Sequence, residues 1–179
     1  MKKPIATITM KDGRKLVLEL YPEIAPNTVN NFIDLANSGQ YDGLTFHRIV
    51  KDFMIQGGSP NGSCASASAF NIKGEFANNG IENNISHKAG VISMARAGHP
   101  DSASTQFFIM HGDGEFLDGQ YAAFGKLIEG AELLKELGNV PTANTQDNPP
   151  LEPVLTKDIR VEPGDWKAEE PKRIIPPIR

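Results

Sequence analysis

The stretch Tyr41–Gly58, YDGLTFHRIVKDFMIQGG, is the most informative part of this chain. Polar and apolar residues alternate over residues 45–50, which is the period of a half-buried strand. On that period Arg48 shares a face with Phe46, and His47 points to the opposite face. An arginine in such an apolar run would be costly to bury without a partner. We therefore expect the guanidinium to line a groove that opens to solvent.

Three residues that follow Arg48 define the kind of ligand that such a groove would take. Phe53 and Met54 can supply an apolar floor, and Gln56 adds a neutral amide before the chain closes on two glycines. One fixed cation beside apolar side chains and an uncharged polar group favours a neutral, partly apolar ligand.

The same stretch resembles the signature of the cyclophilins, the peptidyl-prolyl cis-trans isomerases, whose pattern is F-H-R-[IV]-x-x-x-F-M-[IV]-Q-G-G. Further blocks resemble cyclophilin sequences in the family order, namely Gly90–Gly98 with Ser104–Ile109, and Phe116–Tyr121 with Phe124–Lys126. The similarity runs from about Ile5 to Val161. Because the blocks keep their order, the chain is identified as similar to this family, in its bacterial-like variety.

Composition excludes several other classes of protein. The chain has 179 residues, which suits one domain with a sizeable core, and its net charge of −4 is modest. No basic block precedes the mixed-charge C-terminal part, so a nucleic acid is not an expected partner. The single cysteine, Cys64, excludes an intrachain disulfide framework and suits a reducing compartment.

No targeting or membrane segment is expected from the hydropathy of the chain. Met1, Lys2 and Lys3 resemble the start of a signal peptide, but no apolar run of ~7–15 residues follows them. No segment approaches the ~20 apolar residues of a membrane span. We therefore expect a cytoplasmic protein without a membrane partner.

The periodicity of the chain predicts many short strands and two helices. The Asp-Gly pair at residues 12–13 predicts a tight hairpin between the first two strands. Apolar residues at helical spacing predict helices over Pro26–Asn37 and Ala131–Leu137. The expected strands are Ile5–Met10, Lys15–Leu20, a strand around Phe46, Phe53–Gln56, Val91–Ala95, Gln106–Met110, Ala122–Leu127 and Leu155–Val161.

Short strands at regular spacing indicate a sandwich or a barrel. The resemblance narrows this expectation to a mainly β fold, a closed eight-stranded antiparallel β-barrel capped by two α-helices. It assigns residues 1–162 to a cyclophilin-like isomerase domain, followed by a proline-rich C-terminal tail, residues 163–179. The apolar content of this tail is too high for a solvated segment, so we expect Trp166 to anchor it on the outside of the barrel. The alternative is that a neighbouring molecule orders the tail, for instance with a proline-containing segment in the groove of another copy.

The resemblance also implies a reaction and a set of residues. It implies that the protein isomerises X–Pro bonds without a metal or cofactor, acts on proline-containing peptides and unfolded protein clients, and takes cyclosporin-type macrocycles as a possible ligand. A monomer is expected. Arg48 matches the catalytic residue of the family. The matching substrate-binding residues are Phe53, Met54, Gln56, Ala95, Arg96, Ala97, Gln106, Phe108, Phe116, Leu117 and Tyr121.

Several residues have a simpler structural interpretation. Phe46 and Phe107 are expected in the core, and His47 is more often a hydrogen-bonded structural histidine than a general base. Gln106 could be an ordinary strand amide. The other histidines show no ligand spacing with one another or with Cys64, which argues against a metal site.

Two other functions compete with isomerisation. A proline-peptide binding module without significant turnover is the alternative, but such a module has no need of a cation like Arg48 at its centre. A hydrolase would need a serine or cysteine nucleophile paired with a base, and no nucleophile elbow is present.

The chain departs from the family pattern at a few positions. It has Phe116 where many members carry tryptophan, Tyr121 where many animal members carry histidine, and Arg96 where they carry asparagine. In the loop over residues 61–69, the turn at residues 63–67 reads Ser-Cys-Ala-Ser-Ala where relatives are glycine-rich, so contacts cannot be transferred to this loop by analogy. Within this exposed loop, Cys64 is expected to be a bystander, with a place at the rim of the site as the alternative.

Overall fold

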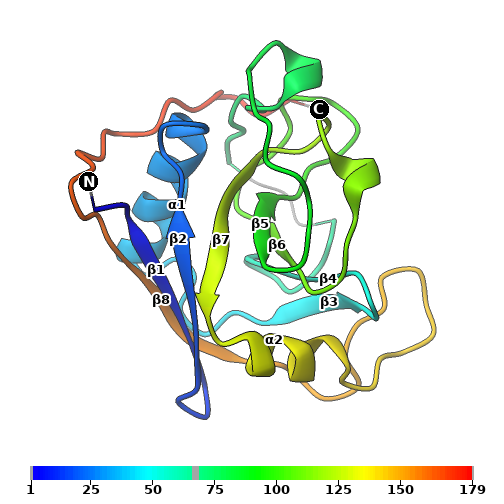
Figure 1. Ribbon diagram of the computed structural model, residues 1–179. Coiled ribbons are helices and arrows are strands. Elements are labelled where there is room, and N and C mark those ends of the chain that lie inside the picture. The colour runs from blue at the N-terminus through cyan, green and yellow to red at the C-terminus, as the bar shows by residue number, and fades with distance from the viewer. Residues whose placement is uncertain (1, 66–68, 179) are drawn as a thin grey trace.

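The computed structural model describes residues 2–65 and 69–178, and it shows a mainly β protein (Figure 1). The strands are β1 (Ile5–Met10), β2 (Lys15–Leu20), β3 (Phe46–Val50), β4 (Met54–Gly57), β5 (Val91–Met94), β6 (Phe107–Met110), β7 (Ala123–Glu129) and β8 (Thr156–Glu162). The α-helices are α1 (Pro26–Asn37) and α2 (Ala131–Gly138), and the short 3-10 helices are η1 (Ala77–Asn79) and η2 (Glu115–Leu117). The first hairpin and α1 have the predicted bounds.

The eight strands form one antiparallel sheet in the order β3-β4-β6-β5-β7-β2-β1-β8. The sheet curls until its two edge strands approach each other, where an isolated bridge joins Thr45 to Leu155. Phe46 N–H donates to the Val154 carbonyl at 3.0 Å, and Thr156 N–H donates to the Leu44 carbonyl at 2.9 Å. The predicted fold class is confirmed. The barrel is not fully closed, however, because no continuous ladder joins the edge strands β3 and β8.

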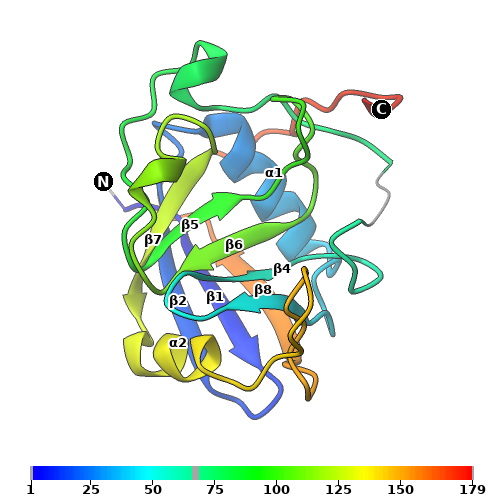
Figure 2. The ribbon, with the colours of Figure 1, turned by 90° about the vertical axis from the view of Figure 1, so that its right-hand side faces the viewer.

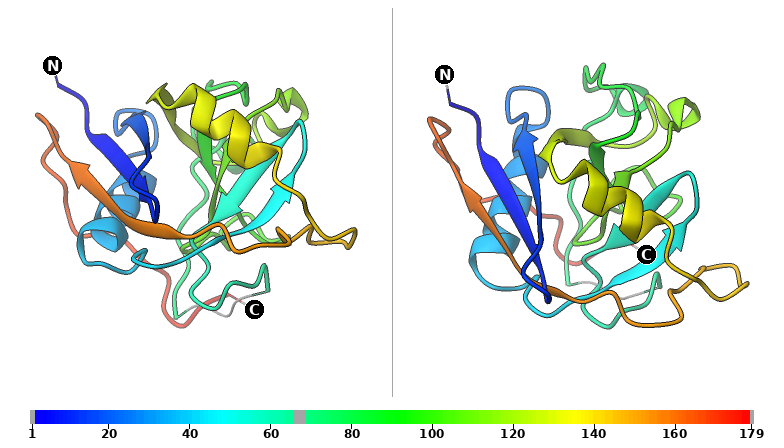
Figure 3. Two further views of the ribbon diagram at one scale, coloured as in Figure 1. Left: turned by 90° about the horizontal axis from the view of Figure 1, so that it is seen from below. Right: turned by 60° about the horizontal axis from the view of Figure 1, so that its bottom comes forward.

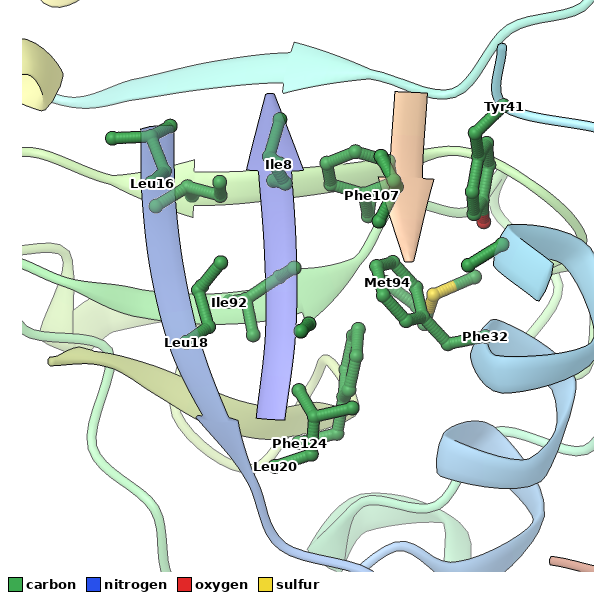
Figure 4. Close-up of a cluster of buried hydrophobic side chains, with 14 of the residues drawn as sticks. Ile8, Leu16, Leu18, Leu20, Phe32, Tyr41, Ile92, Met94, Phe107 and Phe124 are labelled. Carbon is green, nitrogen blue, oxygen red and sulfur yellow. The ribbon is translucent and has the colours of Figure 1, made fainter. Parts of the chain in front are cut away.

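The two helices cover different parts of the curled sheet. Helix α1 packs against β8, whereas α2 contacts β2, β3 and β4 across the lower end (Figures 2 and 3). Phe32 of α1 points into the barrel, where its ring lies 5.3–5.5 Å from those of Tyr41, Phe107 and Phe124 (Figure 4). Among the described residues, no helix has the length and apolar character that a bilayer crossing requires.

A carboxylate from a distant segment caps the N-terminus of α1. Glu75 is buried, and its Oε1 accepts hydrogen bonds from Thr28 N–H and from the Thr28 hydroxyl, both at 2.6 Å. Its Oε2 accepts from Asn27 N–H at 3.3 Å. The first N–H groups of a helix have no partner within the helix and favour negative charge, so Glu75 ties the 70–80 segment to α1.

The sheet carries a second apolar cluster on its outer face, over β4, β5 and β6. Its buried members are Met54, Val91, Phe108, Met110 and Ala123. The alternate residues of the same strands, among them Ile55, Ile92, Phe107 and Ile109, belong to the barrel core. One part of the sheet is therefore apolar on both faces, and its outer face provides the floor of a ligand site.

A bulge in β3 decides where Arg48 points. Phe46 pairs with Gly57 and Arg48 pairs with Gln56, so two steps along β3 match one step along β4. Phe46 and Ile49 lie in the core, whereas Arg48 lines the groove on the outer face. The prediction that Arg48 shares a face with Phe46 is wrong, because the extra residue of a bulge turns the following side chain over.

The double glycine at the end of β4, Gly57 and Gly58, allows the walls of the site to approach closely. Gly58 has a φ of +83°, and a Cβ at this position would lie 2.6 Å from the Thr105 carbonyl oxygen. Any other residue would therefore be strained and would push the backbone at residue 105 away. Gly58 therefore lets the backbone at Thr105 lie against the end of β4.

The C-terminal tail follows β8 directly (Figure 1, red) and docks within the chain with Trp166 as an anchor, as predicted, but the surface that it packs on is α1. The half-buried Trp166 packs against the core, and its Nε1–H donates to Asn30 Oδ1 at 2.8 Å. Arg173 donates to Asn31 and Asp34 of the same helix. The tail is thus held by contacts within the chain.

Candidate active site

A groove with a volume of about 430 Å³ lies on the outer face of the sheet. Its lining contains most of the residues predicted for the site. The predicted residues in the lining are Arg48, Phe53, Met54, Gln56, Ala95, Arg96, Phe108, Phe116, Leu117 and Tyr121, and the others are Cys64, Gln146 and Asp147. Strands β3, β4 and β6 place the floor, and the loops on either side raise the walls.

A second, smaller cavity of about 160 Å³ continues the groove past Gln56. The remaining predicted residues, Ala97 and Gln106, line this cavity. It shares Gln56, Cys64, Ala95 and Arg96 with the main groove, and Ser102, Ser104 and Thr105 complete its wall. The sequence-predicted site is therefore divided between two connected hollows.

A chain of hydrogen bonds crosses the floor from Arg48. Arg48 Nη1 donates to Gln56 Oε1 at 3.2 Å, and Gln56 Nε2 donates to Gln106 Oε1 at 2.9 Å. Gln106 Nε2 in turn donates to the Cys64 carbonyl at 3.2 Å. Gln106 is therefore more than an ordinary strand amide, because it links the main groove to the second cavity and fixes the orientation of Gln56.

His47 supports this chain from the side. Its Nε2–H donates to Gln106 Oε1 at 3.1 Å, while Nδ1 has no hydrogen-bonded partner among the described residues. Burial lowers the pKa of His47 below its ordinary value, so the ring is neutral. A buried, neutral ring that is bonded to a side-chain amide fits the structural interpretation of His47 rather than a general base.

Stacked rings form the apolar end of the groove. The rings of Phe53 and Phe116 stack with centroids 5.5 Å apart, and Phe108 meets Tyr121 edge to face at 5.7 Å. Phe116 is 67 % exposed and stands at the rim. These rings form an open seat with a rigid wall, suited to a flat apolar group.

Arg96 lines the groove, and its side chain also holds the rim. The guanidinium carbon lies 5.0 Å from the centre of the Phe76 ring and 4.7 Å from that of Tyr121. Its Nε and Nη2 donate to the Gln120 carbonyl at 3.0 and 2.8 Å. This cation is thus engaged by the protein, whereas Arg48 donates one bond to Gln56 and lies at the centre of the groove.

A serine, a histidine and an aspartate lie in contact beneath Phe108. His87 Nδ1–H donates to Asp118 Oδ1 and its Nε2 accepts from the Ser93 hydroxyl, both at 2.9 Å. Ser93 and His87 are fully buried, so no substrate reaches the serine oxygen. The trio supports the groove floor from below, and the hydrolase interpretation has no accessible nucleophile here.

The half-buried Cys64 lines both hollows, so its alternative placement at the rim of the site holds and its interpretation as a bystander is wrong. Burial raises the pKa of the Cys64 thiol, which lowers its thiolate content and reactivity at neutral pH. Of the loop predicted over 61–69, residues 66–68 lie outside the described part of the chain.

Two further lining residues, Gln146 and Asp147, were missed because they come from the connection between α2 and β8. This connection projects beside β3 (Figure 3). The Asn148 carbonyl accepts a hydrogen bond from Ile49 N–H at 3.1 Å, next to Arg48. The carboxylate of Asp147 is exposed. No sequence motif marks such a residue, since only the path of the loop brings it to the groove.

The site offers no cluster of metal ligands. Within residues 2–65 and 69–178, no group of three His, Cys, Asp or Glu side chains is arranged to hold a metal ion. What the groove presents is one accessible guanidinium beside an apolar seat and a line of neutral amides. This set can bind an extended peptide and stabilise a lone pair or a partial negative charge near Arg48.

Comparison with known sequences agrees with this arrangement. The family model described as "Cyclophilin type peptidyl-prolyl cis-trans isomerase/CLD" matches residues 5–161. The chain is 45% identical over 130 residues to "Peptidyl-prolyl cis-trans isomerase B" of Bacillus subtilis, covering 73% of this chain and 87% of the relative. It is 42% identical over 152 residues to "Peptidyl-prolyl cis-trans isomerase-like 1" of Neurospora crassa, covering 84% and 91%.

Solved structures show the same fold. A cyclophilin type peptidyl-prolyl cis-trans isomerase of Cryptosporidium parvum, crystallised in the presence of the dipeptide Ala-Pro, superposes with a TM-score of 0.78 at 31% identity. The superposition covers 88% of this chain and 98% of that structure. A cyclophilin of Hirschia baltica gives a TM-score of 0.70 at 26% identity, with 87% and 72% covered.

Proposed function

The chain belongs to the cyclophilin-type family of peptidyl-prolyl cis-trans isomerases and catalyses rotation about X–Pro peptide bonds; we propose that it does so in the groove, with Arg48 as the catalytic residue. The observation that carries this proposal is the position of Arg48, held by Gln56 at the centre of the groove beside an apolar seat. The proposal is tested by an NMR exchange assay on a series of small X–Pro peptides that compares the wild-type protein with the Arg48→Ala variant.

The chemistry needs no bond to be broken. Rotation about the peptide bond crosses a barrier of ~18–20 kcal/mol, because the twisted amide loses its resonance. In the twisted state the proline nitrogen regains a lone pair and accepts a hydrogen bond that the planar amide accepts poorly. A guanidinium placed at that nitrogen binds the transition state more tightly than either planar isomer, which is the requirement for catalysis.

Arginine suits this task better than lysine. Its guanidinium stays protonated and holds several N–H donors in a rigid plane. One of these donors, Nη1–H, is fixed on Gln56 Oε1, so the orientation of the plane is set before the substrate binds. The remaining donors are available for the substrate amide.

The apolar seat has two tasks in this mechanism. Phe53, Met54, Phe108 and Leu117 would hold the proline ring, and they would keep water away from the amide nitrogen. The amides of Gln56 and Gln106 and the backbone of residues 95–97 would bind the peptide on either side. A binding module without turnover would need the same walls but not the cation, so the accessible Arg48 favours the enzyme.

The proposed substrates are proline-containing peptides and proline-containing segments of unfolded protein chains. The relative solved in the presence of Ala-Pro supports this class of ligand. We also propose a monomeric protein in the cytoplasm, where the single cysteine of the sequence would stay reduced.

Asp147 should give the groove a preference for basic substrates. Its exposed carboxylate lines the groove, and no described residue forms an ion pair or hydrogen bond with it. For peptides with lysine or glutamate beside the X–Pro unit, we expect lysine to raise kcat/KM by about two- to five-fold, the range of an exposed ion pair. Asp147→Asn should remove the preference, and ~1 M salt should weaken it.

The matched control for this test is Glu152→Gln. Glu152 is an exposed carboxylate of the same connection that does not line the groove. Glu152→Gln removes one negative charge, as Asp147→Asn does, and it should leave the preference for lysine-containing peptides unchanged. An equal loss in both variants would show that net charge, rather than the position of Asp147, sets the preference.

Cyclosporin-type macrocycles should bind in the groove, but less tightly than to relatives with tryptophan at the rim. Phe116 is exposed and stacks on Phe53, and it lacks the N–H that an indole offers to a carbonyl. A missing hydrogen bond of this kind costs ~0.5–1.5 kcal/mol. Phe116→Trp should therefore tighten inhibition by about two- to ten-fold, while kcat/KM for a small peptide holds steady. Unchanged inhibition would refute the assignment of Phe116 to the rim.

A further inference from the structure

The wall of the second cavity is pinned from behind through four consecutive carbonyl groups, those of residues 102–105. The Ser102 and Ser104 carbonyls accept from the side-chain amides of Asn71 and Asn31, both at 2.9 Å. The Ala103 carbonyl accepts from Ile72 N–H at 2.9 Å, and the Thr105 carbonyl accepts from the Tyr41 hydroxyl at 2.7 Å. This wall carries the side chains of Ser102, Ser104 and Thr105 that line the cavity.

Two of these four supports are in turn held by the C-terminal tail. Arg173 Nε and Nη2 both donate to Asn31 Oδ1, at 3.2 and 3.0 Å. Ile178 N–H donates to Asn71 Oδ1 at 2.6 Å, and the backbones of Asn71 and Ile174 exchange hydrogen bonds of 3.1 and 2.7 Å. Asn31 is fully buried and Asn71 is 5 % exposed.

The orientation of both asparagine amides follows from these contacts. An asparagine side chain has one oxygen that accepts and one nitrogen that donates. Because tail donors take the oxygens of Asn31 and Asn71, their nitrogens face the wall carbonyls. Removing the tail would leave the buried side-chain oxygens of Asn31 and Asn71 without these donors. The tail contacts would then no longer fix the orientation of the two amides.

Arg173 is the residue of the tail that connects it to α1 most directly. Its guanidinium carbon lies 4.1 Å from the centre of the Phe70 ring, and Nη2 also donates to Asp34 Oδ2 at 2.9 Å. The stack on Phe70 and the bonds to Asn31 and Asp34 fix the guanidinium plane. Figures 1 and 2 show the tail, in red, passing α1 on its way to the C-terminus.

We propose that the tail segment 172–178 positions the wall of the second cavity for the substrate, with Arg173 acting through Asn31 on Ser104. Arg173 is a positioning residue, since it touches neither groove nor cavity lining. The inference rests on the proposed function, because it takes the second cavity as part of the peptide path. A peptide that fills only the main groove would not depend on the tail, whereas a longer peptide would.

The test compares a short blocked X–Pro peptide with peptides extended by several residues at either end. In the wild-type protein, extension at one end should lower KM. Arg173→Ala should cancel that gain, raising KM for the extended peptide by about two- to ten-fold, the range of one lost hydrogen bond, with kcat unchanged. KM for the short peptide should not change. Arg173→Lys should restore the gain in part, because an ammonium can still donate to Asn31.

The matched control is Trp166→Phe, which loosens the tail without touching the chain of contacts that leads to the wall. It removes the bond from Nε1 to Asn30 and should lower the melting temperature while keeping the gain from extension. If Arg173→Ala is poorly folded, Arg173→Met serves in its place, since methionine keeps an apolar stem beside Phe70 but has no donor for Asn31. Dissociation constants from chemical-shift titration give the same comparison without relying on turnover or on Arg48.

Three outcomes would overturn the inference. The first is a wild-type protein that gains nothing from extension at either end. The second is an Arg173→Ala variant that keeps the full gain, and the third is a loss of the gain in both variants in proportion to their melting temperatures. Failure of the proposed catalytic role of Arg48 would give a different result. The gain in peptide binding from extension would remain, and the only change would be that the Arg48→Ala variant turns over peptides like the wild-type protein.

Discussion

Arg48→Ala should fold normally and lose about 10²–10³-fold in kcat/KM for an X–Pro peptide. The variant removes the donor for the twisted amide, and deleting a donor aimed at transition-state charge typically costs that much. Arg48 is half-buried, and within residues 2–65 and 69–178 its side chain forms one hydrogen bond, with Gln56, so its loss should change the stability little. NMR exchange spectroscopy gives the turnover, and circular dichroism gives the melting temperature.

Two variants sharpen this test. Arg48→Lys should recover little activity, because a point charge does not reproduce the planar set of donors. Arg14→Ala removes the same charge from the first hairpin, where Arg14 pairs with Asp12 and Glu136, and it should leave turnover unchanged. If folded Arg48→Ala turned over peptides at nearly the wild-type rate, the mechanism would be wrong.

Glu75→Ala should lower the free energy of unfolding by about 2–3 kcal/mol, because Glu75 is a buried cap of α1. The variant leaves the buried N–H and hydroxyl of Thr28 without a partner, and unsatisfied buried donors cost ~1–3 kcal/mol. For a protein of this size each kcal/mol shifts the melting temperature by about 2–4 °C. Calorimetry should therefore show a drop of about 4–12 °C.

Two further variants separate the cap from other effects of the substitution. Glu75→Gln keeps an oxygen that Thr28 N–H can reach but loses the charge at the helix terminus, so an intermediate melting temperature is expected. Glu82→Ala removes an exposed carboxylate nearby in the chain, and surface substitutions of this kind usually stay within ~0.5 kcal/mol. A Glu75→Ala protein that melts like the wild type would show that α1 does not need this cap.

Local sequence determined the elements of this fold because the signals for them are local. The hairpin of Ile5–Met10 and Lys15–Leu20 is encoded by alternation and an Asp-Gly turn, and α1 by apolar spacing after Pro26. The motif around Arg48 belongs to the same class of signal. Residue types at short spacing on one strand pair placed Arg48, Met54 and Gln56 in a single groove, where the structure shows them.

Contacts between distant segments could not be inferred in the same way. The bulge at residues 46–48 depends on how β3 pairs with β4, and it reversed the predicted direction of Arg48. Glu75 caps a helix that begins at Pro26, 49 residues earlier in the sequence. Asp147 reaches the groove only through the path of its loop. None of these pairings has a periodicity that a single sequence can display.

The site as a whole shows the same division. The sequence by itself determined which residues carry the chemistry, because a guanidinium, a line of amides and an apolar seat are properties of side chains. Only the tertiary structure decided how those residues are oriented, since orientation comes from partners far away along the chain. Gln106 orders Gln56, and the tail orders Asn31 behind the second cavity, because buried polar atoms must find donors and acceptors wherever the folded backbone brings them.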